Sequence, residues 1–241
     1  MFYRKIISLK EEVIVIRKSD LPSMAAKVGF HALFLIAVAL CENGRYEEGA
    51  RTFELILRIK KEPQVYFELG CVYIILNRYA DSILAFQSAI SLKPDYFEAY
   101  NDLGSVFLIL RRFDEAEAAY RRSVAINSNY NRGWANLASL YAITQRFSEA
   151  IEPARTAIRI KPDDHISYNT LGGSLFVLGR NDEAKEALEK ALEINPNYNE
   201  AKNNLARVYY KMGLYEKAMT LFMSLGMMDN ARKCLEAMKR N

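Results

Sequence analysis

The chain has 241 residues with only 11 glycines and 6 prolines, too few for the frequent turns of an all-β sandwich or barrel. Apolar residues make up 51% of it, which excludes wholesale disorder. The net charge of +4 is concentrated in residues 1–30 and 229–241, so the middle of the chain is slightly acidic. A slightly acidic middle lacks the broad basic face of a dedicated nucleic-acid binder, and no nucleic-acid partner is expected.

The N-terminal segment, residues 1–29, permits two local structures. Ile6, Leu9, Val13 and Ile16 are spaced as one face of a helix. The β-branched run that ends at Ile16 also suits an extended segment. We favour the helix, and residues 1–29 are expected to act as a covering or self-association element.

Location is predicted from signals that the sequence lacks. Charged residues interrupt the apolar ones near the N-terminus, so no secretory signal forms. The longest uncharged run, residues 28–41, is too short to cross a bilayer, and no transmembrane segment is expected. The 3 cysteines form no CxxC pair, as in proteins of a reducing compartment. The sequence therefore predicts a cytoplasmic protein.

A 34-residue period runs through the chain from residue 30 onward. Three series recur at this spacing: a leucine followed by a small residue, a small residue near the middle of each unit, and a proline near its end. Their members are Leu69-Gly70, Leu103-Gly104, Leu137-Ala138, Leu171-Gly172 and Leu205-Ala206; Ser82, Ala116, Ala150, Ala184 and Ala218; and Pro94, Pro162 and Pro196.

Each period is predicted to form two helices. In the unit that begins at Phe97, the large residues Tyr100, Leu103 and Phe107 are three and four residues apart, and so share one helical face. A polar turn follows at 111–114, and a second helix ends before the proline, which disfavours helical geometry in the residue preceding it. The small residues are expected where the two helices cross.

This pattern resembles the tetratricopeptide repeat (TPR) family. The resemblance implies an all-α fold, a right-handed superhelical solenoid of helix-turn-helix repeats with a C-terminal capping helix. The array is expected over residues 30–232, in about six repeats: 30–62, 63–96, 97–130, 131–164, 165–198 and 199–232. The capping helix is expected over 229–241, with Ala231, Cys234, Leu235 and Met238 on one stripe.

Enzyme motifs are absent from the sequence. It contains no phosphate-binding glycine loop, no HExxH motif and no nucleophile elbow. The two histidines, His31 and His165, have no evident catalytic or metal-binding partners. We therefore expect no enzymatic activity, no catalytic residue, no metal site and no cofactor.

In the TPR family, the first helices of successive repeats line a concave groove. Carried onto this chain, the family's groove positions assign a set of polar peptide-binding residues. They are Asn101, Asp102, Arg132, Asn136, Asn169, Thr170, Asn203, Asn204 and Arg207. An amide both donates and accepts hydrogen bonds, which suits the backbone of an extended peptide. The arrangement is similar to the asparagine ladders of O-linked N-acetylglucosamine transferases, although the same asparagines can equally serve only to hydrate a concave surface.

The groove positions of the first two repeats are apolar instead. They include Phe34, Val38, Phe67 and Ile74. Because a helix that is apolar all round is a buried helix, we expect something to cover this half of the groove. The favoured cover is residues 3–18 of the same chain. The alternatives are the same segment of a second copy, giving a homo-oligomer through residues 1–22, a partner's helix, or a face that stays exposed.

The sequence thus predicts a non-catalytic scaffold or adaptor that binds a protein or peptide. One alternative is a self-assembling TPR scaffold on a bacterial organelle or membrane surface, where the basic ends would permit peripheral membrane association. Two others are an RNA-binding helical-repeat protein and the repeat domain of a larger enzyme. The carboxylate clamp of chaperone-binding members needs an arrangement of Lys, Asn and Arg that this chain lacks, so a chaperone C-terminus is not an expected ligand.

Overall fold

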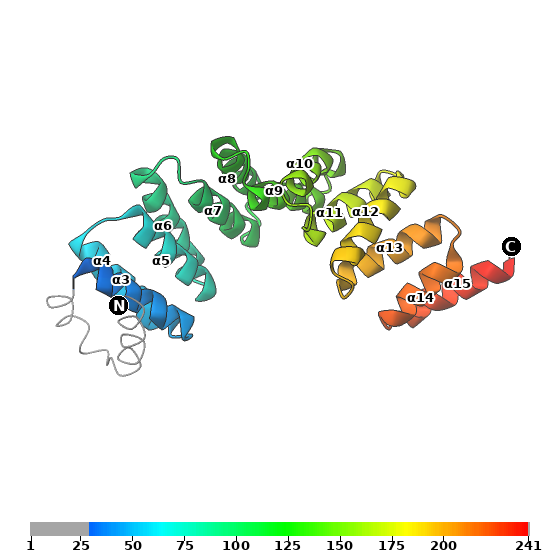
Figure 1. Ribbon diagram of the computed structural model, residues 1–241, viewed down its shortest axis with the longest axis horizontal. Coiled ribbons are helices and arrows are strands. Elements are labelled where there is room, and N and C mark those ends of the chain that lie inside the picture. The colour runs from blue at the N-terminus through cyan, green and yellow to red at the C-terminus, as the bar shows by residue number, and fades with distance from the viewer. Residues whose placement is uncertain (1–28, 241) are drawn as a thin grey trace. The chain divides into compact units, whose positions relative to one another are not determined.

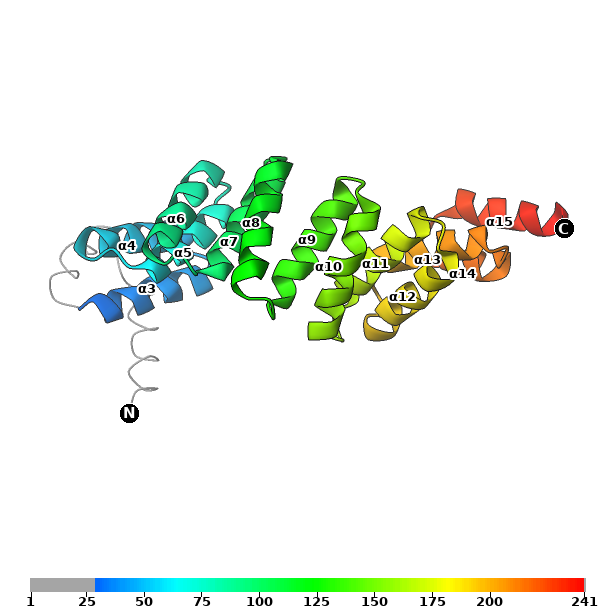
Figure 2. The same ribbon diagram turned by 90° about the horizontal axis from the view of Figure 1, so that it is seen from above.

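The computed structural model describes residues 29–240, which form thirteen α-helices and, within that range, no strand. The chain divides into two compact units, one up to Ile126 and the other from Asn127, and each is described by itself. Within each unit, consecutive helices lie side by side as pairs (Figures 1 and 2). The all-α fold predicted from the 34-residue period is confirmed.

The first unit contains three helix pairs. They are α3 (Phe30–Glu42) with α4 (Tyr46–Ile59), α5 (Pro63–Ile75) with α6 (Tyr79–Leu92), and α7 (Phe97–Ile109) with α8 (Phe113–Ile126). The first helix of each pair begins at the residue where the sequence period places the start of a repeat.

The second unit contains three further pairs and one additional helix. They are α9 (Asn131–Ile143) with α10 (Phe147–Ile160), α11 (His165–Val177) with α12 (Asn181–Ile194), α13 (Asn199–Lys211) with α14 (Tyr215–Ser224), and finally α15 (Met228–Arg240). Helix α15 packs on α14 and buries Ala231 and Cys234, two members of the predicted stripe.

Close crossing of the paired helices depends on glycine. A Cβ atom added to Gly104 would lie 2.8 Å from the ring of Tyr120, and one added to Gly70 would lie 2.7 Å from the ring of Phe86. The glycine of the first helix therefore accommodates a large side chain of the second helix. That side chain lies four residues after the small residue which the sequence period places at the crossing.

The helix ends follow local chemistry. Helices α6, α10 and α12 each end two residues before a proline. The residue directly before the proline is Lys93, Lys161 or Asn195, and each has φ near −133°. Within the pairs, the turn passes through the left-handed region of backbone geometry, which Gly179 adopts at φ 77° and Arg111 at φ 59°. Both kinds of chain break were predicted from the sequence pattern.

Three expectations extend beyond this description. The helix favoured in the N-terminal segment, with its stripe Ile6, Leu9, Val13 and Ile16, lies outside the described residues. The right-handed superhelical twist of the whole array stays a prediction. Across residues 29–240, no helix combines the length and the apolar character that a membrane crossing demands.

Candidate peptide-binding groove

The second unit contains a cavity along its first helices α9, α11 and α13, with a volume of about 600 Å³. We call it the amide groove. It is lined by Ser139, Ala142, Ile143, Phe147, Ile166, Asn169, Thr170, Gly173, Ser174, Val177, Tyr198, Glu200, Asn204 and Arg207. Four of the predicted peptide-binding residues, Asn169, Thr170, Asn204 and Arg207, are thereby brought together.

Two asparagines form the polar centre of the amide groove. Nδ2 of Asn204 on α13 donates a hydrogen bond of 2.9 Å to Oδ1 of Asn169 on α11. Asn169 also hydrogen-bonds the hydroxyl of Tyr198, and that hydroxyl donates in turn to Oε2 of Glu200 at 2.5 Å. Burial and the neighbouring Glu200 carboxylate both raise the pKa of Tyr198, so the phenol remains a hydrogen-bond donor at neutral pH.

This network fixes the amides in one orientation and leaves hydrogen-bonding capacity toward the cavity. A primary amide offers two N–H donors and one carbonyl oxygen. Asn204 uses one N–H on Asn169, and its Oδ1 accepts no hydrogen bond within residues 29–240. Asn204 therefore presents an acceptor and a second donor side by side, the pair that a peptide backbone requires.

Aliphatic side chains border the amides. Ile143 is 57% exposed, Ile166 is 46% exposed and Val177 is 52% exposed, and all three line the groove. Contact between large aliphatic side chains and water is unfavourable. A ligand that covers these side chains therefore gains binding free energy. The amide groove thus combines a polar centre with apolar flanks.

The other predicted residues of the second unit lie outside this cavity lining. Arg132 is exposed, and Asn136 is partly exposed. Both have interactions within the chain. Asn203 is partly buried, and its Oδ1 is buried without a hydrogen-bond partner in the described chain. Within the lining, the hydroxyl of Thr170 donates to the carbonyl oxygen of Ile166, so it is not available as a donor to a ligand in this arrangement.

In the first unit, Asn101 and Asp102 require a correction, because both were expected to line an open groove. Asn101 is 0% exposed and Asp102 is 6% exposed. The Asn101 amide donates to Oδ1 of Asp102 at 2.9 Å, and the Cys71 thiol lies 3.9 Å from Oδ2. A polar side chain is buried when neighbouring groups satisfy its hydrogen bonds, so these two residues belong to the packing between helices and do not line an open groove.

The apolar positions of the first two repeats are half-buried. Phe34 packs edge-to-face on Phe53 at 5.7 Å between ring centroids, and Phe67 lies 5.0 Å from the Tyr96 ring. Val38 and Ile74 are also partly exposed. Whether residues 3–18 cover this face stays a prediction, because that segment lies outside the described residues.

A carboxylate lies beside these apolar residues. Burial raises the pKa of Glu68, and a hydrogen bond with Gln64 offsets part of that rise. Burial and the Glu68 charge together raise the pKa of the Cys41 thiol to about 11. This cysteine is therefore a poor nucleophile at neutral pH.

Metal-binding and acid–base chemistry have few candidate residues. No cluster of three or more His, Cys, Asp or Glu residues able to hold a metal ion exists between Gly29 and Arg240. The His165 ring lies 3.2 Å from the Asn195 amide nitrogen and packs edge-to-face on Tyr198. These two contacts are typical of a histidine that stabilises the packing between neighbouring segments.

Sequence reasoning missed the polar groove residues Tyr198 and Glu200 and the aliphatic flanks Ile143, Ile166 and Val177. A usable signal existed, because tyrosines at 96, 130 and 198 end repeats and are spaced by multiples of 34 residues. That signal indicated a repeated structural contact, but it did not reveal that the phenol reaches back to an amide near the start of the same repeat.

Comparison of the sequence with known protein families gives a match. Residues 9–237 match the family described as the cilia and flagella-associated protein 70 C-terminal domain. No curated protein matches the sequence.

Several solved structures share the fold. The crystal structure of MamA is 25% identical, with a TM-score of 0.63, over 67% of this chain and 95% of MamA. YrrB, a TPR protein with an unusual peptide-binding site, is 18% identical with a TM-score of 0.64, over 79% of this chain and 99% of YrrB. PilF of Pseudomonas aeruginosa is 21% identical with a TM-score of 0.61, over 74% of this chain and 90% of PilF. The TPR array inferred from the sequence is thereby confirmed.

Proposed function

Because this chain belongs to the family of the cilia and flagella-associated protein 70 C-terminal domain, a TPR domain, we propose that it is a non-catalytic interaction module. TPR domains generally mediate protein–protein interactions. For this chain, the proposed ligand is an extended peptide segment of a protein partner, and the proposed site is the amide groove of the second unit.

The hydrogen-bonded pair Asn169 and Asn204 is the observation that carries the proposal. An extended peptide presents an N–H and a C=O group at each residue, and both need partners once water is excluded. Amides held in one orientation by Tyr198 and Glu200 supply these partners without the entropic cost of ordering two free side chains.

The aliphatic flanks supply the remaining affinity. Side chains of an extended peptide point alternately to opposite sides, so alternate residues can enter one groove. Ile143, Ile166 and Val177 would cover the apolar ones among them. The amide centre then fixes the backbone, while the flanks select for apolar side chains.

The test uses a random-peptide library selected on the purified full chain. The affinity of each selected peptide is measured by fluorescence polarisation for the wild type and for the Asn169→Ala/Asn204→Ala variant. Loss of two hydrogen-bonding side chains is expected to raise Kd about tenfold or more. Circular dichroism and thermal melting verify that the variant is folded.

A matched control separates the groove from general surface polarity. The Asn129→Ala/Asn197→Ala variant removes two exposed turn asparagines of the same unit and is expected to leave Kd unchanged. Equal affinity for all three proteins, or a library that yields no binding peptide, contradicts the proposal.

The setting of the partner is a separate question. The family takes its name from a protein of cilia and flagella, which makes ciliary assemblies the first place to search for the partner. The cytoplasmic location and the homo-oligomer through residues 1–22 remain proposals. Imaging of the tagged chain and its sedimentation with and without residues 1–22 test them.

A further inference from the structure

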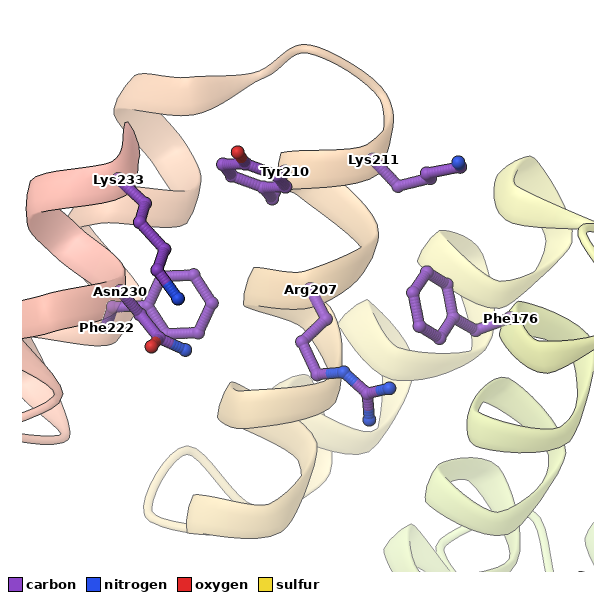
Figure 3. A pocket seen from close by; sticks show the side chains of 7 residues that line it. All are labelled: Phe176, Arg207, Tyr210, Lys211, Phe222, Asn230 and Lys233. Carbon is purple, nitrogen blue, oxygen red and sulfur yellow. The ribbon is translucent and has the colours of Figure 1, made fainter. Parts of the chain in front are cut away.

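A second cavity lies beside the amide groove, between α11, α13, α14 and α15, with a volume of about 250 Å³. We call it the cationic pocket. Seven residues line it, and Figure 3 shows them: Phe176, Arg207, Tyr210, Lys211, Phe222, Asn230 and Lys233. All belong to the second unit. Arg207 lines both cavities, so the pocket continues the groove toward the C-terminal helix.

The pocket has three cations and no acidic side chain in its lining. Arg207, Lys211 and Lys233 form no ion pair within the described part of the chain. Two other arginines of the same unit are paired with carboxylates: Arg146 with Glu149 at 2.6 Å, and Arg180 with Glu183 at 2.7 Å. The positive charge around this cavity is therefore left for a ligand to neutralise.

An aromatic ring holds one of these cations, Arg207, in place. The Arg207 guanidinium lies 5.0 Å from the centroid of the Phe176 ring, a cation–π distance. In Figure 3, Lys233 and Asn230 reach from α15 to the Phe222 ring, while Arg207 extends from α13 beside Phe176. A guanidinium stacked on a ring is ordered before a ligand arrives, which favours two-point binding of a carboxylate.

We propose that the cationic pocket binds an acidic side chain of the peptide that occupies the amide groove, next to an apolar side chain of the same peptide. This inference rests on the proposed function and adds the chemistry of the partner. The carboxylate would contact the Arg207 guanidinium, and the two lysines would add positive charge around the cavity. The apolar neighbour would cover Tyr210, which is 40% exposed.

The aromatic geometry favours a peptide over a nucleic acid. Single-stranded nucleic acids bind by stacking bases on free aromatic faces. Phe222 is only 3% exposed, and the Phe176 ring already carries the Arg207 guanidinium. Too few free faces remain for a run of stacked bases, whereas a carboxylate needs only the cations.

The experiment compares two labelled peptides that differ only in charge. In one, glutamate alternates with leucine and phenylalanine; in the other, glutamine replaces every glutamate. Fluorescence polarisation at low salt is expected to give the glutamate peptide a Kd about tenfold lower than that of the glutamine peptide. The Lys211→Gln/Lys233→Gln variant is expected to reduce this difference, because only Arg207 remains, without changing the Kd of the glutamine peptide.

The control variant, Lys161→Gln/Lys239→Gln, makes the same change in net charge outside the pocket lining and is expected to retain the preference for glutamate. The inference is overturned if the two peptides bind equally, or if pocket and control variants lose the same affinity. It is also overturned if a labelled oligouridylate binds more tightly than the glutamate peptide and loses affinity in the pocket variant.

The Asn169→Ala/Asn204→Ala variant distinguishes failure of the pocket from failure of the groove. If this variant weakens both peptides while the pocket variant weakens neither, the proposed function stands and the inference about charge fails. If only the pocket variant matters, the cationic pocket binds acidic peptides and the amide groove does not take part.

Discussion

At the scale of single residues, two neighbouring glycines of α11 have opposite environments. A Cβ atom added to Gly172 would lie 2.5 Å from Cγ of Leu188 and 3.1 Å from the Ala184 carbonyl oxygen. A Cβ atom added to Gly173 would meet only Nδ2 of Asn204, at an ordinary 3.6 Å. The close crossing of α11 and α12 therefore requires glycine at position 172, whereas position 173 has room for a larger side chain.

Alanine substitution at these two positions is expected to act in opposite directions. Gly172→Ala overpacks the crossing and is expected to lower the free energy of unfolding by about 1–3 kcal/mol. Gly173→Ala restricts the unfolded chain without a clash and is expected to raise it by about 0.5–1 kcal/mol. Thermal melts monitored by circular dichroism check both values, and a change of the same sign in the two variants would refute this account of the crossing.

A second residue-scale prediction concerns Glu68 and pH. Burial raises the pKa of this carboxyl above its ordinary value, so the folded state binds the proton more tightly than the unfolded state. Its contribution to stability is complete below the ordinary glutamate pKa and is lost as pH rises through the pKa of the folded state. At neutral pH, the buried charge therefore costs stability.

Glu68→Gln is accordingly expected to raise Tm near neutral pH, and this gain is expected to shrink as pH falls through the raised folded-state pKa and to be absent below the ordinary glutamate pKa. The exposed Glu186 provides the matched control, because Glu186→Gln makes the same chemical change in contact with water. A gain in Tm for Glu68→Gln that is equally large in acid would show that burial of the charge is not its cause.

At the scale of helices, α10 contains a buried proline in its interior, Pro153. Three other second helices have alanine at the same position: Ala85, Ala119 and Ala187. Proline lacks the N–H that an interior helical hydrogen bond requires, and its ring crowds the preceding turn. Proline at position 153 therefore makes α10 less stable than alanine, the residue at the equivalent position of the three other helices, would.

Pro153→Ala is expected to raise the free energy of unfolding by about 1–2 kcal/mol, after allowance for the greater freedom of the unfolded chain. Pro63 is the matched control, because it occupies the first turn of α5. There the backbone N–H has no hydrogen-bond acceptor within the helix, so proline removes no helical hydrogen bond. Pro63→Ala is expected to leave stability unchanged or lower it. Chemical denaturation checks both variants, and destabilisation by Pro153→Ala would contradict the argument.

At the scale of the whole molecule, the fold followed from the sequence because one constraint repeats every 34 residues. Each repeat has a small residue where helices cross and a turn after the first helix. An ambiguous helix boundary in one repeat is therefore fixed by the equivalent positions of the other repeats. Helix starts such as Phe97 and His165 were predictable on that basis. The site was less predictable, since groove residues differ from repeat to repeat and carry no shared pattern.

Particular residues show the limit. The position in the repeat that leaves Asn169 facing a cavity buries Asn101 completely, because burial depends on side chains from neighbouring helices. The hydrogen bond between Tyr198 and Asn169, and the pocket that Lys233 and Arg207 line together, likewise depend on residues distant in sequence. Helical periodicity predicts the face on which a residue lies, but contacts across helices depend on the packing distance.

Arg207 borders two cavities with a single guanidinium. A segment that fixes its orientation in one cavity alters what the other cavity offers, so occupancy of the two is thermodynamically linked. This linkage is reciprocal, so each half of the proposed peptide would change the affinity of the other half by the same factor. Fragments measured separately will therefore not sum to the binding free energy of the intact segment.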